Sequence, residues 1–535
     1  MTTFLPNRSF LFASRSWACA AALLALPSAA LNAQDYGTKS PVPPATASTP
    51  APSAAPSSTP AAPAAGTAAP AGPVRPAYQV LPYNENWSVL PKVKDEGDFF
   101  DPIKHVPLSE DGSIWASFGG QIRLRLEAWD GFNFGANAAG GAPFAGPNDD
   151  VFLLSRFLFH SDIHFGPNVR VFLEGKSALS TDRDLLGGRR TLEVDELDLQ
   201  NGFVDFTLPL SDKGDKATIR AGRQELLFGK QRLVSPLDWA NVRRTFDGIS
   251  TPIKVGDWTV TPFWTKPVIV EKYEFNNLPD DDQDFMGVYA AGKIPTTDIG
   301  LDLYWLYLDK DAIAFNGITN VATGFNGTVG DEERHTLGGR VWGVLPNTNF
   351  DWEIEGAYQF GELGAGDIDA FMFTAVAGYT FKEMGWQPRF FVGFDYASGD
   401  KAAGGDVETF NQLFPLGHAY FGWIDQIGRQ NIIDVYPGVT FKPVKTVSVD
   451  IHGHLFWRAE DTDGAYNAGG ARFRAPGVGL SNEIGQEIDL LIKWQFDRHT
   501  EIHFGYNHFF AGKFIDQSGP SEDIDFAYVV FQFTF

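Results

Sequence analysis

Residues 121–128 read Gln-Ile-Arg-Leu-Arg-Leu-Glu-Ala, with polar and apolar side chains in strict alternation. Successive side chains of a β-strand point to opposite faces. The segment would therefore place Gln121, Arg123, Arg125 and Glu127 on one face and only aliphatic side chains on the other. One such face suits water and the other suits hydrocarbon, so the stretch predicts a strand with two differently solvated faces.

The same alternation recurs along the chain, for example in residues 351–360, 447–455 and 487–495. Some successive segments are separated by only a few residues, at 382–386, 443–445 and 497–499, and others by long acidic or glycine-rich stretches, at 271–284, 310–333, 399–429 and 459–483. We count about eighteen such strands, which alternate between short and long connections as in outer-membrane barrels. The fold class predicted is all-β, a transmembrane antiparallel β-barrel whose closure pairs every backbone group in lipid.

Composition excludes several classes of protein. The chain carries 66 acidic against 42 basic residues, a net charge of −24, whereas a nucleic-acid binder needs a basic footprint. Beyond the extreme N-terminus there is no uncharged apolar stretch long enough for a membrane-spanning helix. The single cysteine, Cys19, lies in the N-terminal segment, so a processed chain would have neither disulfides nor thiolate metal sites.

The N-terminal region differs from the rest. Residues 1–33 combine Arg8 and Arg15 with a short apolar core and small residues, which is typical of a cleaved secretory signal peptide. Residues 34–77 follow as a Pro/Ala-rich linker, with 11 prolines and 13 alanines in positions 41–77, and we expect this linker to be disordered. Residues 78–535 are then the predicted barrel.

The end of the chain is typical of an outer-membrane barrel. Phe531, Phe533 and Phe535 alternate with Gln532 and Thr534, and the last residue is a phenylalanine. We expect the barrel assembly machinery to recognise the final strand through Phe535, and outer-membrane lipid to surround the barrel.

A barrel of about eighteen strands is too wide for its side chains to fill, which leaves a lumen whose charges determine selectivity. By parity with their apolar neighbours, seven arginines are predicted to face inward: Arg123, Arg125, Arg156, Arg170, Arg223, Arg389 and Arg458. A guanidinium is always charged and can form two parallel hydrogen bonds to one carboxylate, so a row of them suits anionic cargo. In the alternative interpretation, inward carboxylates neutralise these arginines, which then only brace the wall.

Other chemistry has weaker support. His160, Asp162 and His164 share one strand face, but the outer two would lie about 13 Å apart, too far for one metal ion. Residues 450–454 offer two adjacent histidines and no evident third ligand. No phosphate-binding loop, zinc-protease motif or serine elbow occurs. We therefore expect no catalytic residues, no metal and no cofactor, and keep an outer-membrane hydrolase only as an alternative.

Several stretches resemble the alginate export family of outer-membrane porins. The most specific is Gly222-Arg223-Gln224-Glu225-Leu226, which continues through residues 229–234 and 241–248. Further matches lie at 83–88, 101–108, 115–127, 413–420 and 428–431. The resemblance implies an eighteen-stranded monomeric barrel through which an anionic exopolysaccharide crosses the outer membrane. It also implies an arginine-rich constriction, carried over here onto the following residues: Arg123, Arg125, Arg223, Arg243, Arg244 and Arg429.

The sequence thus predicts an outer-membrane porin, and not an enzyme, that passes an alginate-like anionic polysaccharide or smaller anions. One alternative is a general or uptake diffusion porin. Another is a structural or adhesive surface barrel whose lumen is plugged.

Overall fold

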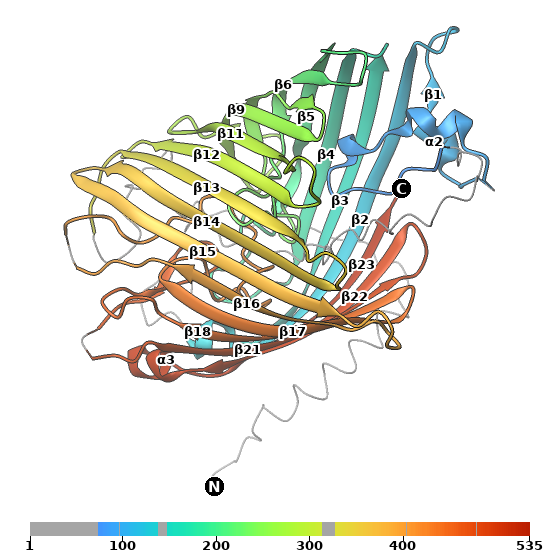
Figure 1. Cartoon of the computed structure of the whole chain (residues 1–535). Coiled ribbons are helices and arrows are strands. Elements are labelled where there is room, and N and C mark those ends of the chain that lie inside the picture. The colour runs from blue at the N-terminus through green and yellow to red at the C-terminus, as the bar shows by residue number, and fades with distance from the viewer. Residues whose placement is uncertain (1–72, 96, 137–146, 313–326, 403, 478) are drawn as a thin grey trace.

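The computed structural model describes residues 73–535 except 96, 137–146, 313–326, 403 and 478, so the predicted signal peptide and nearly all of the linker lie outside the described residues. The described chain forms a closed antiparallel β-barrel of eighteen strands (Figure 1). The barrel closes where β2 (Ile114–Asp130) pairs with β23 (Ile524–Thr534), with Ile122 opposite Phe533. The predicted fold class is confirmed.

Neighbouring strands follow one another round the barrel in chain order. Between β2 and β23 these are β3 (Asp150–Phe165), β4 (Val169–Thr181), β5 (Asp195–Pro209), β6 (Lys216–Gln224), β7 (Phe246–Ser250), β8 (Ile253–Val255), β9 (Trp258–Ile269), β11 (Gln283–Lys293), β12 (Gly300–Lys310), β13 (Glu332–Val344), β14 (Phe350–Leu363), β15 (Gly366–Thr380), β16 (Arg389–Ala397), β17 (Ile432–Val444), β18 (Val447–Trp457), β21 (Glu483–Gln495) and β22 (Thr500–Ala511). β7 and β8 are two halves of one interrupted strand, because both pair with β6 and with β9.

The remaining elements are short. They are η1 (Pro82–Asn84), η2 (Trp87–Lys92), α2 (Asp101–Lys104), β1 (Val106–Pro107), η3 (Phe132–Gly135), β10 (Leu278–Pro279), β19 (Ala465–Tyr466), β20 (Arg472–Arg474) and α3 (Lys513–Ser518). Within the described ranges, no helix has the length and apolar character needed to cross a membrane.

The two ends of the barrel differ in their connections. At one end, which we call the short-turn end, few residues join successive strands, as at 381–388, 445–446 and 496–499. At the other, the long-loop end, most connections are long, among them 182–194, 225–245, 398–431 and 458–482. Figure 1 shows α2 and the C-terminus at the short-turn end and α3 at the opposite end. This asymmetry is the one expected from the sequence.

The outer wall is apolar. Side chains exposed on it include Phe159 and Leu173 next to the closure and Leu303, Ile354 and Ile488 further round. Aromatic residues cluster near the short-turn end, for example Phe381, Trp386 and Phe496. An apolar band flanked by aromatic residues is the outer surface that a bilayer requires.

The residues before β2 form an N-terminal strap, residues 76–92, at the short-turn end. Arg498 donates to the Pro76 carbonyl at 2.7 Å, which ties the start of the strap to the turn between β21 and β22. Further along, Tyr83 is only 5% exposed and packs edge-on against Phe172 and Phe203, whose ring centroids lie 5.4 and 5.1 Å away. The strap therefore lines part of the inner wall.

Candidate functional site

Two long loops fold into the barrel and meet there. Loop A, residues 225–245, and loop B, residues 398–431, are joined by a parallel bridge between Val234 and Phe414. In that bridge Ser235 N donates to Phe414 O at 2.9 Å, and Phe414 N donates to Leu233 O at 2.9 Å. The two loops together narrow the lumen, and we call this region the constriction.

Loop A crosses from one side of the barrel to the other. Near its end, the carbonyls of Asp238, Trp239 and Ala240 accept hydrogen bonds from Arg123 on β2. Nearer its start, Arg232 donates to Glu353 and Glu355 on β14, at 2.5 and 2.6 Å. Since β2 and β14 lie far apart in the circle of strands, loop A spans the lumen.

The local sequence explains why loop A turns inward. Gly222 has a φ of +128°, and a Cβ there would lie 2.2 Å from the Gly202 carbonyl, so only glycine keeps β6 paired with β5 at this point. Beyond Gln224, where β6 ends, the loop is rich in large apolar side chains such as Leu233, Leu237 and Trp239, all buried. Such a segment gains stability by burial and would lose it in water.

Asp238 lies among several arginines. Its carboxylate is 2.7 Å from Arg156 and 3.4 Å from Arg243. Although burial by itself would raise the pKa of Asp238, the Arg156, Arg243 and Arg123 guanidiniums hold it well below its usual range. Arg243 also pairs with Glu225 at 2.7 Å and donates to the Val80 carbonyl of the strap at 2.8 Å.

Trp239 provides the central ring of the constriction. The Arg125 guanidinium carbon lies 3.6 Å from the centroid of the Trp239 ring, and the His418 ring stacks on it at 4.4 Å. Arg125 also pairs with Glu127 at 2.7 Å. Burial keeps the pKa of His418 well below its usual range, so this ring is neutral, with Nδ1 3.1 Å from the Asp425 carboxylate.

Three further predicted arginines face the interior and pair with carboxylates. Arg170 makes a bidentate pair with Asp162, at 2.6 and 2.7 Å. Arg389 makes one with Asp351, at 2.9 and 2.6 Å, near the short-turn end. In loop B, Arg429 is fully buried and pairs with Asp395 of β16.

Three predicted arginines have a different set of partners. Arg123 donates to the three loop A carbonyls, Arg244 to the carbonyls of Ser235 and Pro415, and Arg458 to loop carbonyls and Asn482. In the part of the chain that the structure describes, no carboxylate forms an ion pair with any of these three. Carbonyl groups therefore hold all three guanidiniums in place. The Asp238 carboxylate lies near Arg123 without forming an ion pair with it, whereas no carboxylate of the described residues acts on Arg244.

Arg223 lies on the opposite side of the wall from the constriction. The register places it opposite Asp247 and beside Ala221, whose partner Ile249 is exposed on the outer surface. Its guanidinium makes a bidentate pair with Asp247, at 2.8 and 2.9 Å. Of the ten predicted arginines, Arg223 is the one that the pairing register orients outward.

Sequence reasoning missed several residues of the constriction. Asp238, Trp239 and Asn241 carry much of its geometry, and Arg232 joins it to β14. The only signal was that residues 229–234 and 241–248 already belonged to the family-like stretch. No periodicity marks these residues, since they lie in a loop.

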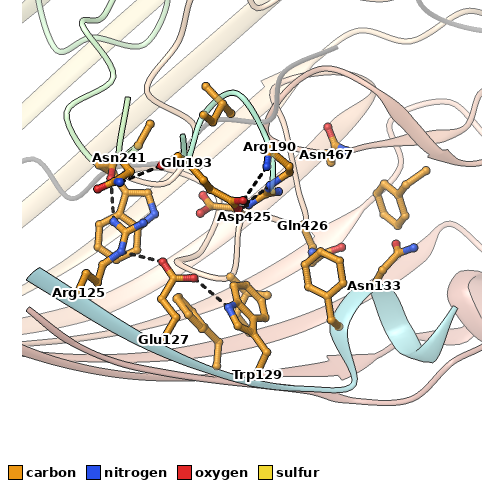
Figure 2. Close-up of a pocket in the computed structure, with 17 residues that line it drawn as sticks. Arg125, Glu127, Trp129, Asn133, Arg190, Glu193, Asn241, Asp425, Gln426 and Asn467 are labelled. Carbon is orange, nitrogen blue, oxygen red and sulfur yellow. Dashed lines mark hydrogen bonds and ion pairs between the residues drawn. The ribbon is translucent and has the colours of Figure 1, made fainter. Parts of the chain in front are cut away.

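A cavity of about 240 Å³ opens beside the constriction, toward the long-loop end (Figure 2). The wall residues Arg125, Glu127 and Trp129 line one side of it, and Trp129 Nε1 donates to Glu127 at 3.0 Å. Arg190 and Glu193 come from the connection after β4, and Asp425 from loop B. Figure 2 shows their side chains converging on this space.

Comparison with known proteins identifies relatives of this barrel. A family model described as alginate export matches residues 114–528. No curated protein sequence matches the chain.

Solved structures with the same fold come from Pseudomonas. Pseudomonas aeruginosa OccD3 (OpdP) is 11% identical with a TM-score of 0.50, over 87% of this chain and 99% of that one. Pseudomonas aeruginosa OccK3 (OpdO) and a BenF-like porin from Pseudomonas fluorescens Pf-5 are also 11% identical with TM-scores of 0.50, each over 78% of this chain and over 95% and 98% of their own. At such low identity these structures establish the shared fold.

Proposed function

The chain belongs to the alginate export family, and from that premise we propose that this outer-membrane porin passes an anionic polysaccharide, or smaller anionic solutes, through a constriction with a local excess of positive charge. The family match supports a polysaccharide cargo. We further propose that the protein acts as a channel and not as an enzyme.

The observation that carries the proposal is the set of guanidiniums without a carboxylate partner. Arg123 and Arg244 both bind loop A carbonyls within the constriction, and among the described residues neither forms an ion pair. Carbonyl dipoles hold a guanidinium in place but leave its net charge, which acts over a longer range in a poorly hydrated space. A passing carboxylate would meet a favourable potential there, even though the whole chain is acidic.

Arg244 provides the sharpest test, because it is half-buried and its substitution leaves the buried ion pairs intact. We expect the wild-type protein in planar bilayers under a potassium chloride gradient to show a reversal potential that indicates anion preference. Arg244→Gln should reduce that preference and Arg244→Glu should reduce it further. Arg223→Gln removes the same charge on the outward face and should leave the reversal potential unchanged.

Cation preference in the wild-type channel would overturn the proposal of anionic cargo. Equal permeation of all small solutes, with no effect of Arg244→Glu, would favour a general diffusion porin. A folded barrel without any conductance would favour the structural or adhesive alternative with a plugged lumen.

Biogenesis belongs to the same proposal. We expect removal of residues 1–33 on export, recognition of the last strand by the barrel assembly machinery through Phe535, and a monomeric barrel in the membrane. Mass spectrometry of the N-terminus and the mass of the detergent-solubilised protein would test the first and the last of these.

A further inference from the structure

The cavity in Figure 2 offers a kind of recognition that differs from charge selection. We propose that it is a subsite for a single pyranose unit of the cargo, which it recognises by ring hydroxyls and not by a carboxylate. The inference rests on the proposed function only in taking the cargo to be a polysaccharide.

The charged groups of this cavity largely cancel. Its two arginines face three carboxylates: Arg125 pairs with Glu127 at 2.7 Å, Arg190 pairs with Glu193 at 2.5 Å, and Asp425 lies beside them. A cargo carboxylate therefore gains no net attraction here, in contrast to the field around Arg123 and Arg244. Closely spaced donors and acceptors suit hydroxyl groups, because each hydroxyl can both donate and accept a hydrogen bond.

Asn241 adds a specific requirement, namely that the ligand provide a hydrogen-bond donor. Its Nδ2 donates to the carbonyls of Ser155, Leu179 and Glu193, at 3.0, 3.1 and 2.9 Å, and these three bonds fix the orientation of the amide. Its Oδ1 is buried and has no hydrogen-bond partner among the described residues. A buried acceptor without a partner is costly, and only a donor can satisfy it. A sugar hydroxyl provides a donor, whereas a carboxylate does not.

Aromatic rings complete the lining. Trp129 stacks on Phe526 with 3.9 Å between ring centroids, and Phe132 meets Trp129 edge-on at 5.3 Å. Phe473 approaches from the connection between β18 and β21. A pyranose has apolar C–H faces and a polar rim, so a space with ring walls and hydrogen-bonding groups complements both.

The size of the cavity limits what it can hold. At about 240 Å³ it is smaller than the usual range for drug-sized ligands, about 300–1,000 Å³. It would therefore accept one ring of a chain at a time. Five connections at the long-loop end and the end of β2 converge on it, which places it where a polymer passes between the long loops and the constriction.

Calorimetric titration of the detergent-solubilised barrel tests this subsite without requiring conduction. The probes are cellotriose as a neutral trimer, the corresponding β-1,4-linked uronic acid trimer, and sodium acetate as a bare carboxylate. We expect both trimers to bind with similar affinity and little dependence on salt, and acetate not to compete. Binding of the uronic acid trimer alone, weakened by salt, would overturn the inference.

Two variants locate the binding. Asn241→Leu removes the free acceptor, and Gln426→Leu removes a second amide that lines the cavity without being needed for the Asn241 bonds. Each should weaken cellotriose binding by about tenfold or more, equal to about 1.4 kcal/mol. Gln387→Leu, an exposed amide in a turn at the short-turn end, is the matched control. Unchanged cellotriose affinity in a folded Gln426→Leu protein would overturn the inference even where Asn241→Leu fails to fold.

The combined results distinguish a failure of the subsite proposal from a failure of the proposed function. An anion-selective channel that binds neither trimer refutes the subsite alone. A protein that binds cellotriose but prefers cations, or does not conduct, refutes the proposed function and leaves the subsite in place.

Discussion

At the scale of single residues, the partner of each arginine determines what its charge can do. Arg170 and Arg389 form bidentate pairs with carboxylates, so they brace the wall. Arg123 and Arg244 bind carbonyls and keep their charge. The sequence does not distinguish these two roles, because an arginine that faces the interior can meet either a carboxylate or a carbonyl in the folded protein.

Asp238 offers a residue-scale prediction. Asp238→Asn removes the carboxylate next to Arg156 and Arg243. Arg156 then has no ion pair and Arg243 keeps only Glu225, so the free energy of unfolding should fall by roughly 3 kcal/mol. The anion preference of the channel should increase at the same time, since the constriction becomes more positive. Urea unfolding and reversal potentials measure the two effects.

The control for this experiment is Asp281→Asn, whose carboxylate is exposed and should contribute little. The pH dependence gives a second check. Because the folded pKa of Asp238 is depressed, its stabilisation is fully present above its unfolded pKa of about 3.9 and is lost as the pH falls through the folded pKa. If the difference in unfolding free energy between the wild type and Asp238→Asn declined between pH 7 and pH 5, that result would contradict this account.

At the scale of elements, loop A, loop B and the N-terminal strap set the shape of the interior. The strap is fixed to the constriction, since Arg243 donates to the Val80 carbonyl and Tyr83 donates to the Glu225 carbonyl at 3.0 Å. Tyr83 packs against Phe172 and Phe203 in an apolar cluster that Leu81 of the strap shares.

Tyr83→Ala should therefore detach the strap. Removal of a buried aromatic side chain costs about 3–5 kcal/mol, more than a short segment can lose and stay docked. Chymotrypsin should then cleave after Trp87, which is buried in the wild-type protein, and mass spectrometry would map the cut. Val74→Ala, at an exposed position, should leave Trp87 protected. Equal protection in both variants would show that other contacts hold the strap.

At the scale of the whole molecule, closure between β2 and β23 makes the barrel compatible with lipid. Phe535 N donates to Gly120 O at 3.0 Å, and Gly120 N donates to Phe535 O at 2.9 Å, so the last residue completes the ladder. Backbone groups without partners in lipid cost several kcal/mol each, and closure removes them.

Deletion of residues 531–535 should abolish folding into lipid vesicles. The truncation leaves the segment of β2 from Gln121 to Leu124 without its partner strand, which exposes a row of backbone groups to lipid. The measurement is the heat-dependent shift of the folded barrel in electrophoresis, with no assembly machinery present. Phe535→Leu keeps the backbone bonds and should still fold, and a truncated chain that folds normally would refute the closure argument.

The strands, their number and the two kinds of connection could all be predicted from the sequence. Alternation along a strand is a local property, since each side chain reports the solvent on its own face. The short connections predicted at 382–386, 443–445 and 497–499 are observed between β15 and β16, β17 and β18, and β21 and β22. The stretches quoted for the family resemblance at 229–234, 241–248, 413–420 and 428–431 fall in or beside loops A and B, but nothing in them predicted that these loops turn inward.

The pairing of charges inside the barrel could not be predicted from the sequence, because it depends on contacts between residues far apart in the chain. Parity placed Arg223 and Glu225 on one face, but β6 ends at Gln224, so Glu225 turns inward with loop A while Arg223 stays on the outer wall. Arg232 meets Glu353 across 121 positions of sequence. The sequence by itself determined the barrel, because the alternation of polar and apolar side chains is a property of neighbouring residues within each strand. The tertiary structure alone decided which charges are cancelled, because that depends on which distant segments a folded loop brings together.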